Sequence, residues 1–118
     1  METKQLGYYT LPNGTKLHFS INAWYNLEED CGMKAAAWMT EFGDEIAKED
    51  RNEFVLLDLL ADLCAAAGKA YAQEEDLEYS INRFKMRNIL LELSGEEIIA
   101  LSNLIFGTST ADDRLGGK

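Results

Sequence analysis

Proline is nearly absent from this chain of 118 residues: Pro12 is the only one. Because proline breaks the interior of a helix, its scarcity favours a helix-rich fold. Cysteine and histidine are also few, with Cys31, Cys64 and His18 as the complete set. A structural zinc site takes four such ligands, so no metal site is expected. A disulfide is possible, but we expect the two cysteines to be buried thiols.

Long hydrophobic runs are missing as well. No apolar stretch approaches the ~18 residues that a membrane-spanning helix needs. Residues 1–9 mix acidic and basic side chains without a long apolar core, so they are not expected to be a signal peptide. These absences predict a protein of the cytoplasm with no membrane among its partners.

Basic side chains are scarce relative to acidic ones. There are 11 lysines and arginines against 21 aspartates and glutamates, and the formal net charge is -10. Binding to a phosphate backbone calls for clustered Lys and Arg, so no nucleic acid is expected as a partner. The plainer interpretation of the negative charge is solubility, although it could also steer the protein towards a basic partner.

The residues that are present suffice for one domain, expected to span residues 1–107. With 47% hydrophobic residues, the chain should bury a core without the help of disulfides or bound metal ions. Residues 6–21 predict a β-hairpin, because Asn13-Gly14 after Pro12 is a strong turn signal. Beyond the turn, alternation predicts one apolar and one polar face. The apolar set is Leu17, Phe19 and Ile21; the polar set is Lys16, His18 and Ser20.

Apolar residues spaced three to four apart then predict a series of helices. The first, over 22–31, should end at Gly32, because glycine readily takes a left-handed conformation. A second is expected over 33–42, followed by a polar loop over 43–50. The third, from 50 to about 71, is apolar almost all round, which predicts a central helix covered by its neighbours or by another copy of the chain. Its narrow polar stripe is Arg51, Asp58, Asp62 and Lys69.

Capping patterns place the remaining helix starts. Asp50-x-x-Glu53 should open the third helix and Ser94-x-x-Glu97 the fifth. A fourth helix lies between them, capped by Ser80 or Asn82 after an acidic connector over 73–78. The fifth helix should end at Gly107 and leave 108–118 as a flexible tail. The expected fold is therefore mainly α (α+β), with an N-terminal hairpin packed on a bundle of about five helices over 22–107.

Catalytic motifs are not found. His18 is expected on the solvent-exposed face of its strand. Asp58 and Asp62 lie on one helix face, as an acid–base pair would, but they are interpreted as the solvated stripe of a buried helix. The sequence contains no Gly-rich phosphate loop, nucleophile elbow or EF-hand spacing. We therefore expect neither enzymatic activity nor a cofactor.

Aromatic residues and the last helix supply the candidates for partner binding. Aromatic residues are enriched at protein interfaces, and five tyrosines and tryptophans crowd into the first 40 positions: Tyr8, Tyr9, Trp24, Tyr25 and Trp38. The tryptophans could equally fill the core beneath the hairpin, which leaves Tyr25 as the better candidate. On the last helix, Ile99 and Phe106 lie about a quarter-turn from the main apolar face, so that helix needs cover on two sides. The main face is Ile98, Leu101 and Ile105.

Residues 11–32 have an organisation known from one protein family. A turn at Gly14 leads into an alternating strand, and a helix follows at once. In that helix Ala23 and Leu27-Glu28 match an Ala-x-x-x-Leu-Glu pattern, and a run of helices comes after it. In these respects the chain resembles the tail assembly chaperones of long-tailed bacteriophages and prophages.

The resemblance implies a role in assembly within the bacterial cytoplasm. Such chaperones coat the long helical tape-measure protein, keep it soluble and help tail-tube subunits to assemble around it, and they are not expected in the mature virion. The implied partners are therefore the tape-measure protein, the tail-tube protein and further copies of this chain. The side with Ile99 and Phe106 and part of the central helix are the expected binding surface.

Many members of this family are made in two forms, the longer one through a minus-one frameshift near the end of the gene. The resemblance implies that this chain is the shorter form. The codons for Leu115-Gly116-Gly117-Lys118 would be a natural place for the ribosome to slip.

The alternative function is that of an acidic inhibitor that mimics nucleic acid. Such a protein needs carboxylates spaced like phosphates along one surface. Here the acidic residues gather instead in runs near the ends of elements, such as Glu28-Glu29-Asp30 and Glu74-Glu75-Asp76. A tight, salt-sensitive complex with a nuclease or polymerase would favour this alternative.

Overall fold

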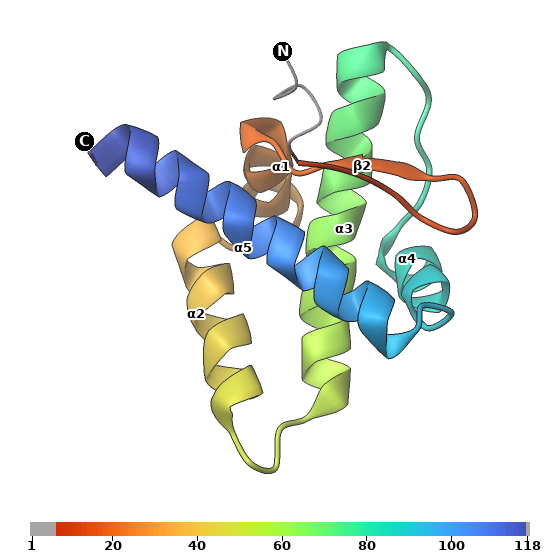
Figure 1. The fold of residues 1–118 in the computed structure, drawn as a ribbon. Coiled ribbons are helices and arrows are strands. Elements are labelled where there is room, and N and C mark those ends of the chain that lie inside the picture. The colour runs from red at the N-terminus through yellow and green to blue at the C-terminus, as the bar shows by residue number, and fades with distance from the viewer. Residues whose placement is uncertain (1–6, 118) are drawn as a thin grey trace.

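A computed structural model describes the backbone of residues 7–117 and the side chains of residues 7–106. Within that range an antiparallel hairpin of two strands is followed by five helices (Figure 1). The elements are β1 (Tyr8–Thr10), β2 (Lys16–His18), α1 (Ile21–Cys31), α2 (Ala35–Ala47), α3 (Glu53–Glu75), α4 (Arg83–Leu90) and α5 (Gly95–Gly117). The predicted mainly helical α+β fold is thus confirmed. Leu6 of the predicted hairpin and Lys118 of the predicted tail lie outside the described residues.

The hairpin turns where Asn13 and Gly14 predict it. Gly14 has a φ of 93°, and the Asn13 side chain accepts a hydrogen bond from the Thr15 N–H at 3.0 Å. Leu17 and Phe19 are buried as the alternation predicts. The prediction for Ile21 is wrong, because the chain has already left the strand and Ile21 begins α1 with 78% of its surface exposed.

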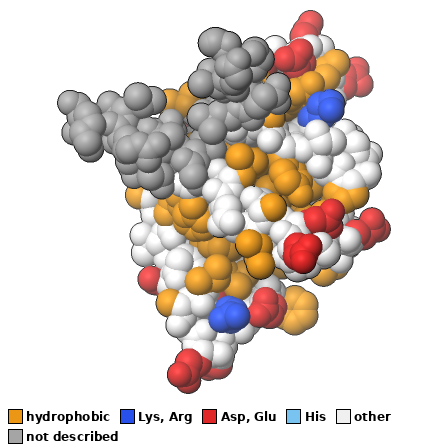
Figure 2. Space-filling model, in the orientation of Figure 1, with side chains coloured by type: hydrophobic (Ala, Val, Ile, Leu, Met, Phe, Trp, Pro, Cys, Tyr) orange, Lys and Arg blue, Asp and Glu red, His pale blue; other side chains and the backbone are white. Residues whose placement is uncertain are grey.

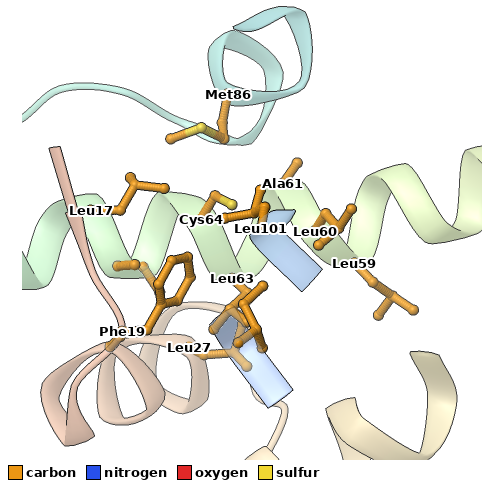
Figure 3. Packing of buried hydrophobic residues seen from close by; sticks show 14 of the residues in the cluster. Leu17, Phe19, Leu27, Leu59, Leu60, Ala61, Leu63, Cys64, Met86 and Leu101 are labelled. Atoms are coloured by element: carbon orange, nitrogen blue, oxygen red, sulfur yellow. The ribbon is translucent and has the colours of Figure 1, made fainter. Parts of the chain in front are cut away.

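α3 is the central helix of the protein, as its nearly all-round apolar sequence predicts. It contacts α1, α2, α4 and β2, and α5 crosses it (Figure 1). Figure 3 shows Met86 of α4 on one side of α3 and Phe19 and Leu27, from the hairpin and α1, on the other. Leu101 of α5 reaches the same core. The core is therefore built around one helix rather than between two layers.

The two cysteines have different environments. Cys64 is fully buried in α3, where burial raises the pKa of its thiol and keeps it unreactive. Cys31 is also a free thiol, but it is exposed, so the prediction that both would be buried is wrong for Cys31. The physical reason is that α1 ends there, and the chain turns away at Gly32 with a left-handed φ of 70°, as predicted.

Helix boundaries depart from the predictions at α2 and α3. α2 runs on to Ala47, through part of the predicted loop, because the Glu45 carboxylate is held by Lys48 and by the Asn52 N–H. The cap of α3 is Asn52, whose side chain accepts hydrogen bonds from the N–H groups of Phe54 and Val55. The predicted capping box beginning at Asp50 is therefore wrong. Asn is as good a cap as Asp, and here it stands immediately before the helix.

The starts of α4 and α5 agree with the predictions from sequence, but the end of α5 does not. Of the two alternatives for α4, Asn82 is the cap, and its side chain accepts from the Lys85 N–H at 3.0 Å. Ser94 and Glu97 cap α5 reciprocally, as predicted. α5 then continues through Gly107 to Gly117, so the prediction that it ends at Gly107 is wrong. Glycine ends a helix only where it turns left-handed, and no proline follows to prevent continuation. No helix in the described part of the chain is both long and apolar enough to cross a membrane.

Candidate partner-binding groove

An apolar groove of about 890 Å³ lies between α2, the start of α3, the turn after α4, and α5. Its lining is mostly hydrophobic: Phe42, Ile46, Phe54, Leu56, Leu57, Leu60, Leu90, Leu91, Leu93, Ile98, Ile99 and Phe106. Figure 2 shows hydrophobic side chains gathered across this face of the molecule, with acidic side chains towards its edges. The volume of the groove exceeds the 740 Å³ or so of a second pocket, which lies beside Tyr79 and Arg83.

Large apolar side chains stand exposed around the groove. Phe54 has 76% of its surface exposed, Leu91 63% and Ile99 61%. Single exposed hydrophobic residues are ordinary, but three around one apolar groove form a contiguous patch, and such patches mark interaction sites. The three come from α3, from the turn after α4 and from α5, so only the tertiary fold brings them together.

The inner end of the groove is stiff because aromatic rings pack against one another there. The rings of Trp38 and Phe42 are stacked with centroids 4.9 Å apart, and the Phe106 ring lies 5.8 Å from Phe42. The indole N–H of Trp38 donates to the Leu59 carbonyl at 2.8 Å, which satisfies the only polar atom of that buried side chain. A partner would therefore meet a preformed surface at this end.

The three predicted partner-binding residues do not share one site. Ile99 and Phe106 both line the groove. Ile99 is exposed, whereas Phe106 is half-buried, with its ring against Trp38 and Phe42, and packs against the core. Tyr25 is 62% exposed on α1, and the groove lining does not include it.

Sequence reasoning missed Phe54 and Leu91 as groove residues. Phe54 lies in a helix that is apolar on nearly every side, so periodicity cannot single out its one exposed ring. Leu91 follows α4 in a turn, and its exposure depends on where α5 crosses. The Trp38 alternative is resolved in favour of the core, since Trp38 is fully buried.

The candidate acid–base residues are tied into ion pairs. Asp62 is buried and receives two hydrogen bonds from Arg83, at 2.6 and 2.8 Å. Asp58 pairs with Arg87 at 2.6 Å. The interpretation as a solvated stripe is therefore wrong for Asp62, because α4 packs over it and covers it with Arg83. The Asp58 side chain remains 40% exposed beside its arginine.

His18 is also partnered rather than solvent-exposed, which corrects a second prediction. Its Nδ1 lies 2.5 Å from a Glu74 carboxylate oxygen, and its ring stacks on Tyr8 with centroids 3.9 Å apart. The sequence placed Glu74 in a connector, but α3 extends to Glu75 and carries that carboxylate over the polar face of the hairpin. These contacts give His18 a structural role in fastening the hairpin.

The comparisons with known proteins assign no family to this chain. No family model matches the chain, and no curated protein and no solved structure is found to match it. Among the described residues, no group of three or more His, Cys, Asp or Glu side chains is placed to hold a metal ion. The groove is thus the feature on which a functional argument can be built.

Proposed function

We propose that this protein is a tail assembly chaperone of a long-tailed phage or prophage, which binds and solubilises the tape-measure protein during tail morphogenesis. The observation that carries the proposal is the apolar groove between α2, α3 and α5, with exposed Phe54 and Ile99 around it. The resemblance of residues 11–32 to that family supports it independently.

The groove suits the physical problem that such a chaperone solves. A long helix with an apolar stripe aggregates unless the stripe is covered. A groove of helices can cover it by the helix-in-groove mode, in which residues three and four apart enter one hydrophobic channel. Burial of that stripe stabilises the complex by about 25 cal/mol per Å² of apolar surface, before the cost of ordering the partner.

The rest of the molecule acts as a scaffold in this proposal, with no catalytic step. The Asp62–Arg83 and His18–Glu74 contacts hold elements together rather than activating a substrate. By the same resemblance, the tail-tube protein is a further partner, and a coat of many copies requires self-association.

The proposal expects a long helical protein to be encoded downstream of this gene, and the test is co-expression with that protein. We expect Ile99→Glu to fold normally but to lose co-purification with that protein and leave it insoluble, because a charge would enter the apolar interface. Ile21→Glu is the matched control: it makes the same change at a more exposed isoleucine on α1. Retained binding by Ile99→Glu would overturn the proposal for this groove.

Phe54→Glu provides a second variant in case Ile99→Glu proves unstable. Phe54 is 76% exposed, so its replacement should leave the melting temperature nearly unchanged while removing the other side of the contact. Tyr25→Glu, tested in parallel, would show whether α1 also contributes to binding. Loss of binding only in Tyr25→Glu would move the site to α1.

The gene offers a separate test of the family assignment. Gly116-Gly117-Lys118 can be encoded by codons that contain a slippery heptamer of the form G-GGA-AAR. We expect that heptamer, an overlapping minus-one frame and a very long helical open frame downstream. The lack of all three in the nucleotide sequence would count against the assignment.

A further inference from the structure

The groove leaves few polar groups free to recognise a small, strongly polar ligand. Its charged lining residues are Arg51 and Glu53, and their side chains pair with each other at 3.5 Å. Arg51 also donates to the Ile46 carbonyl at 3.3 Å. The remaining surface is mainly aliphatic and aromatic, and it extends outwards to exposed Phe54 and Ile99. An occupant must therefore present a long apolar stripe.

The chain segments that supply most of the groove lining are strongly acidic. These segments, residues 41–57 and 91–99, contain nine acidic residues and two basic ones. Glu53 is in the lining itself, and each of the other acids lies within two positions of a lining residue along the chain; together they are called the acidic border. Both cations are engaged: Lys48 pairs with Glu45 at 3.1 Å, and Arg51 pairs with Glu53. Seven exposed carboxylates of these segments form no ion pair with any residue that the structure describes: Glu41, Asp44, Glu49, Asp50, Glu92, Glu96 and Glu97.

This charge argues against a second copy of the same chain as the occupant. Each copy has a net charge of -10, so docking one copy into the groove of another would bring like charges together around an apolar contact. A partner with basic flanks would instead be attracted by the same carboxylates and would gain the apolar contact as well.

We infer that the groove binds an amphipathic helix of a partner protein whose apolar stripe is flanked by lysines and arginines. The inference rests on the proposed function in taking the occupant to be a helix of the protein that is kept soluble. It adds the chemical character of the segment that is recognised. The apolar stripe enters between Phe54 and Ile99, and the basic flanks meet the acidic border.

Two synthetic helical peptides of about 20 residues test this with the complete chain. Both have the same apolar stripe at i, i+3, i+4 and i+7 spacing; one is flanked by lysine and the other by glutamate. By fluorescence anisotropy we expect only the lysine-flanked peptide to bind, with affinity falling about tenfold from low to high salt. Equal binding of both peptides, or no salt dependence, would overturn the inference.

Charge variants locate the effect at the groove. Glu49→Lys with Glu92→Lys should weaken the lysine-flanked peptide about tenfold or more and admit the glutamate-flanked one. Glu29→Lys with Glu78→Lys makes the same change in net charge at exposed residues of α1 and of the connector after α3, outside the segments 41–57 and 91–99, and should change affinity much less. Equal effects of the two pairs would mean that the whole acidic surface binds the peptide, and would overturn the inference.

The remaining outcomes separate this inference from the proposed function. Binding of the lysine-flanked peptide that Ile99→Glu abolishes, without binding of any tape-measure protein, would support the inference and overturn the function. If Ile99→Glu abolished binding of the tape-measure protein, but the complete chain preferred the glutamate-flanked peptide, the result would support the proposed function and overturn the inference. Self-association that Ile99→Glu abolishes would identify a second copy as the occupant and overturn the inference.

Discussion

At the scale of single residues, Asp62 and Asp58 occupy adjacent turns of α3 but differ in exposure. The Asp62 side chain is 9% exposed and receives both hydrogen bonds of the Arg83 fork. The Asp58 side chain is 40% exposed and pairs with Arg87. The contact with Asp62 raises the pKa of the Arg83 guanidinium, so the arginine remains charged.

The two aspartates should therefore differ in their contribution to stability. We expect Asp62→Asn to lower the free energy of unfolding by about 1–3 kcal/mol, because it removes a charge-assisted pair from a buried position. Asp58→Asn should cost about 1 kcal/mol or less, since exposed pairs contribute little. Urea unfolding of both variants measures the difference, and equal losses would contradict it.

Gly68 is a residue whose importance comes from a single neighbour. It lies inside α3, and the side chain of Tyr79 packs directly over it. A Cβ at position 68 would clash with the Tyr79 hydroxyl oxygen and with the adjoining ring carbons. The spacing of apolar residues in α3 does not predict the contact between Gly68 and Tyr79, because Tyr79 lies in the connector that follows α3.

Gly68→Ala should therefore destabilise the protein although alanine favours helices. We expect a loss of about 1–3 kcal/mol from the displaced tyrosine. Gly43→Ala in α2 is the matched control: nothing lies within 4 Å of a Cβ there. That change should raise stability by about 0.5–1 kcal/mol through helix propensity alone. Thermal unfolding of the two variants should give shifts of opposite sign.

At the scale of elements, the start of α3 depends on Asn52 and on the loop that precedes it. The Asn52 side chain caps α3, while its backbone N–H donates to the Glu45 carboxylate at 2.6 Å. That hydrogen bond, together with Lys48, holds the pKa of Glu45 below its ordinary value. The end of α2 and the start of α3 are thus fastened to each other next to the groove.

Replacement of the cap tests this assignment against the one predicted from sequence. Asn52→Ala should lower the free energy of unfolding by about 1 kcal/mol, because two N–H groups lose their acceptor. Asp50→Ala should change it by about 0.5 kcal/mol or less, as for an ordinary surface residue. If Asp50→Ala were the more damaging variant, the capping box would be right and Asn52 would not be the cap.

At the scale of the whole molecule, Glu74 fastens the hairpin and the first helix to the far end of α3. Its carboxylate receives hydrogen bonds from Ser20 and Asn22 and contacts His18. Burial alone would raise the Glu74 pKa, but the bonds from Asn22, His18 and Ser20 outweigh it and hold that pKa below the ordinary 4.5. One side chain thus joins three elements.

The depressed pKa makes a prediction for acid stability. The contribution of Glu74 is fully present above its ordinary pKa of 4.5 and is lost as pH falls through the lower folded value. We expect wild type to lose stability on acidification by more than Glu74→Gln does. Glu75→Gln, at an exposed neighbour, is the control and should follow wild type. Parallel acid titrations of Glu74→Gln and wild type would contradict the prediction.

Elements whose signals are local could be predicted from the amino-acid sequence alone. The Asn13-Gly14 turn, the Gly32 helix end and the reciprocal Ser94–Glu97 cap each depend on residues within a few positions of one another. The central place of α3 was also predictable, because an apolar surface all round one helix needs cover on every side. The mainly helical fold follows from these signals and from the lack of proline.

Which side chains are exposed and which have a partner could not be predicted, because it depends on how the helices pack. Arg83 covers Asp62, Glu74 reaches His18, and α5 leaves Ile99 exposed, all through contacts between residues far apart in the chain. The groove has the same origin, because Phe54, Leu91 and Ile99 meet only when α5 crosses the other helices. The spacing of apolar residues predicts which face of a helix is apolar, whereas the exposure of each residue depends on the neighbours that the packed helices bring to it.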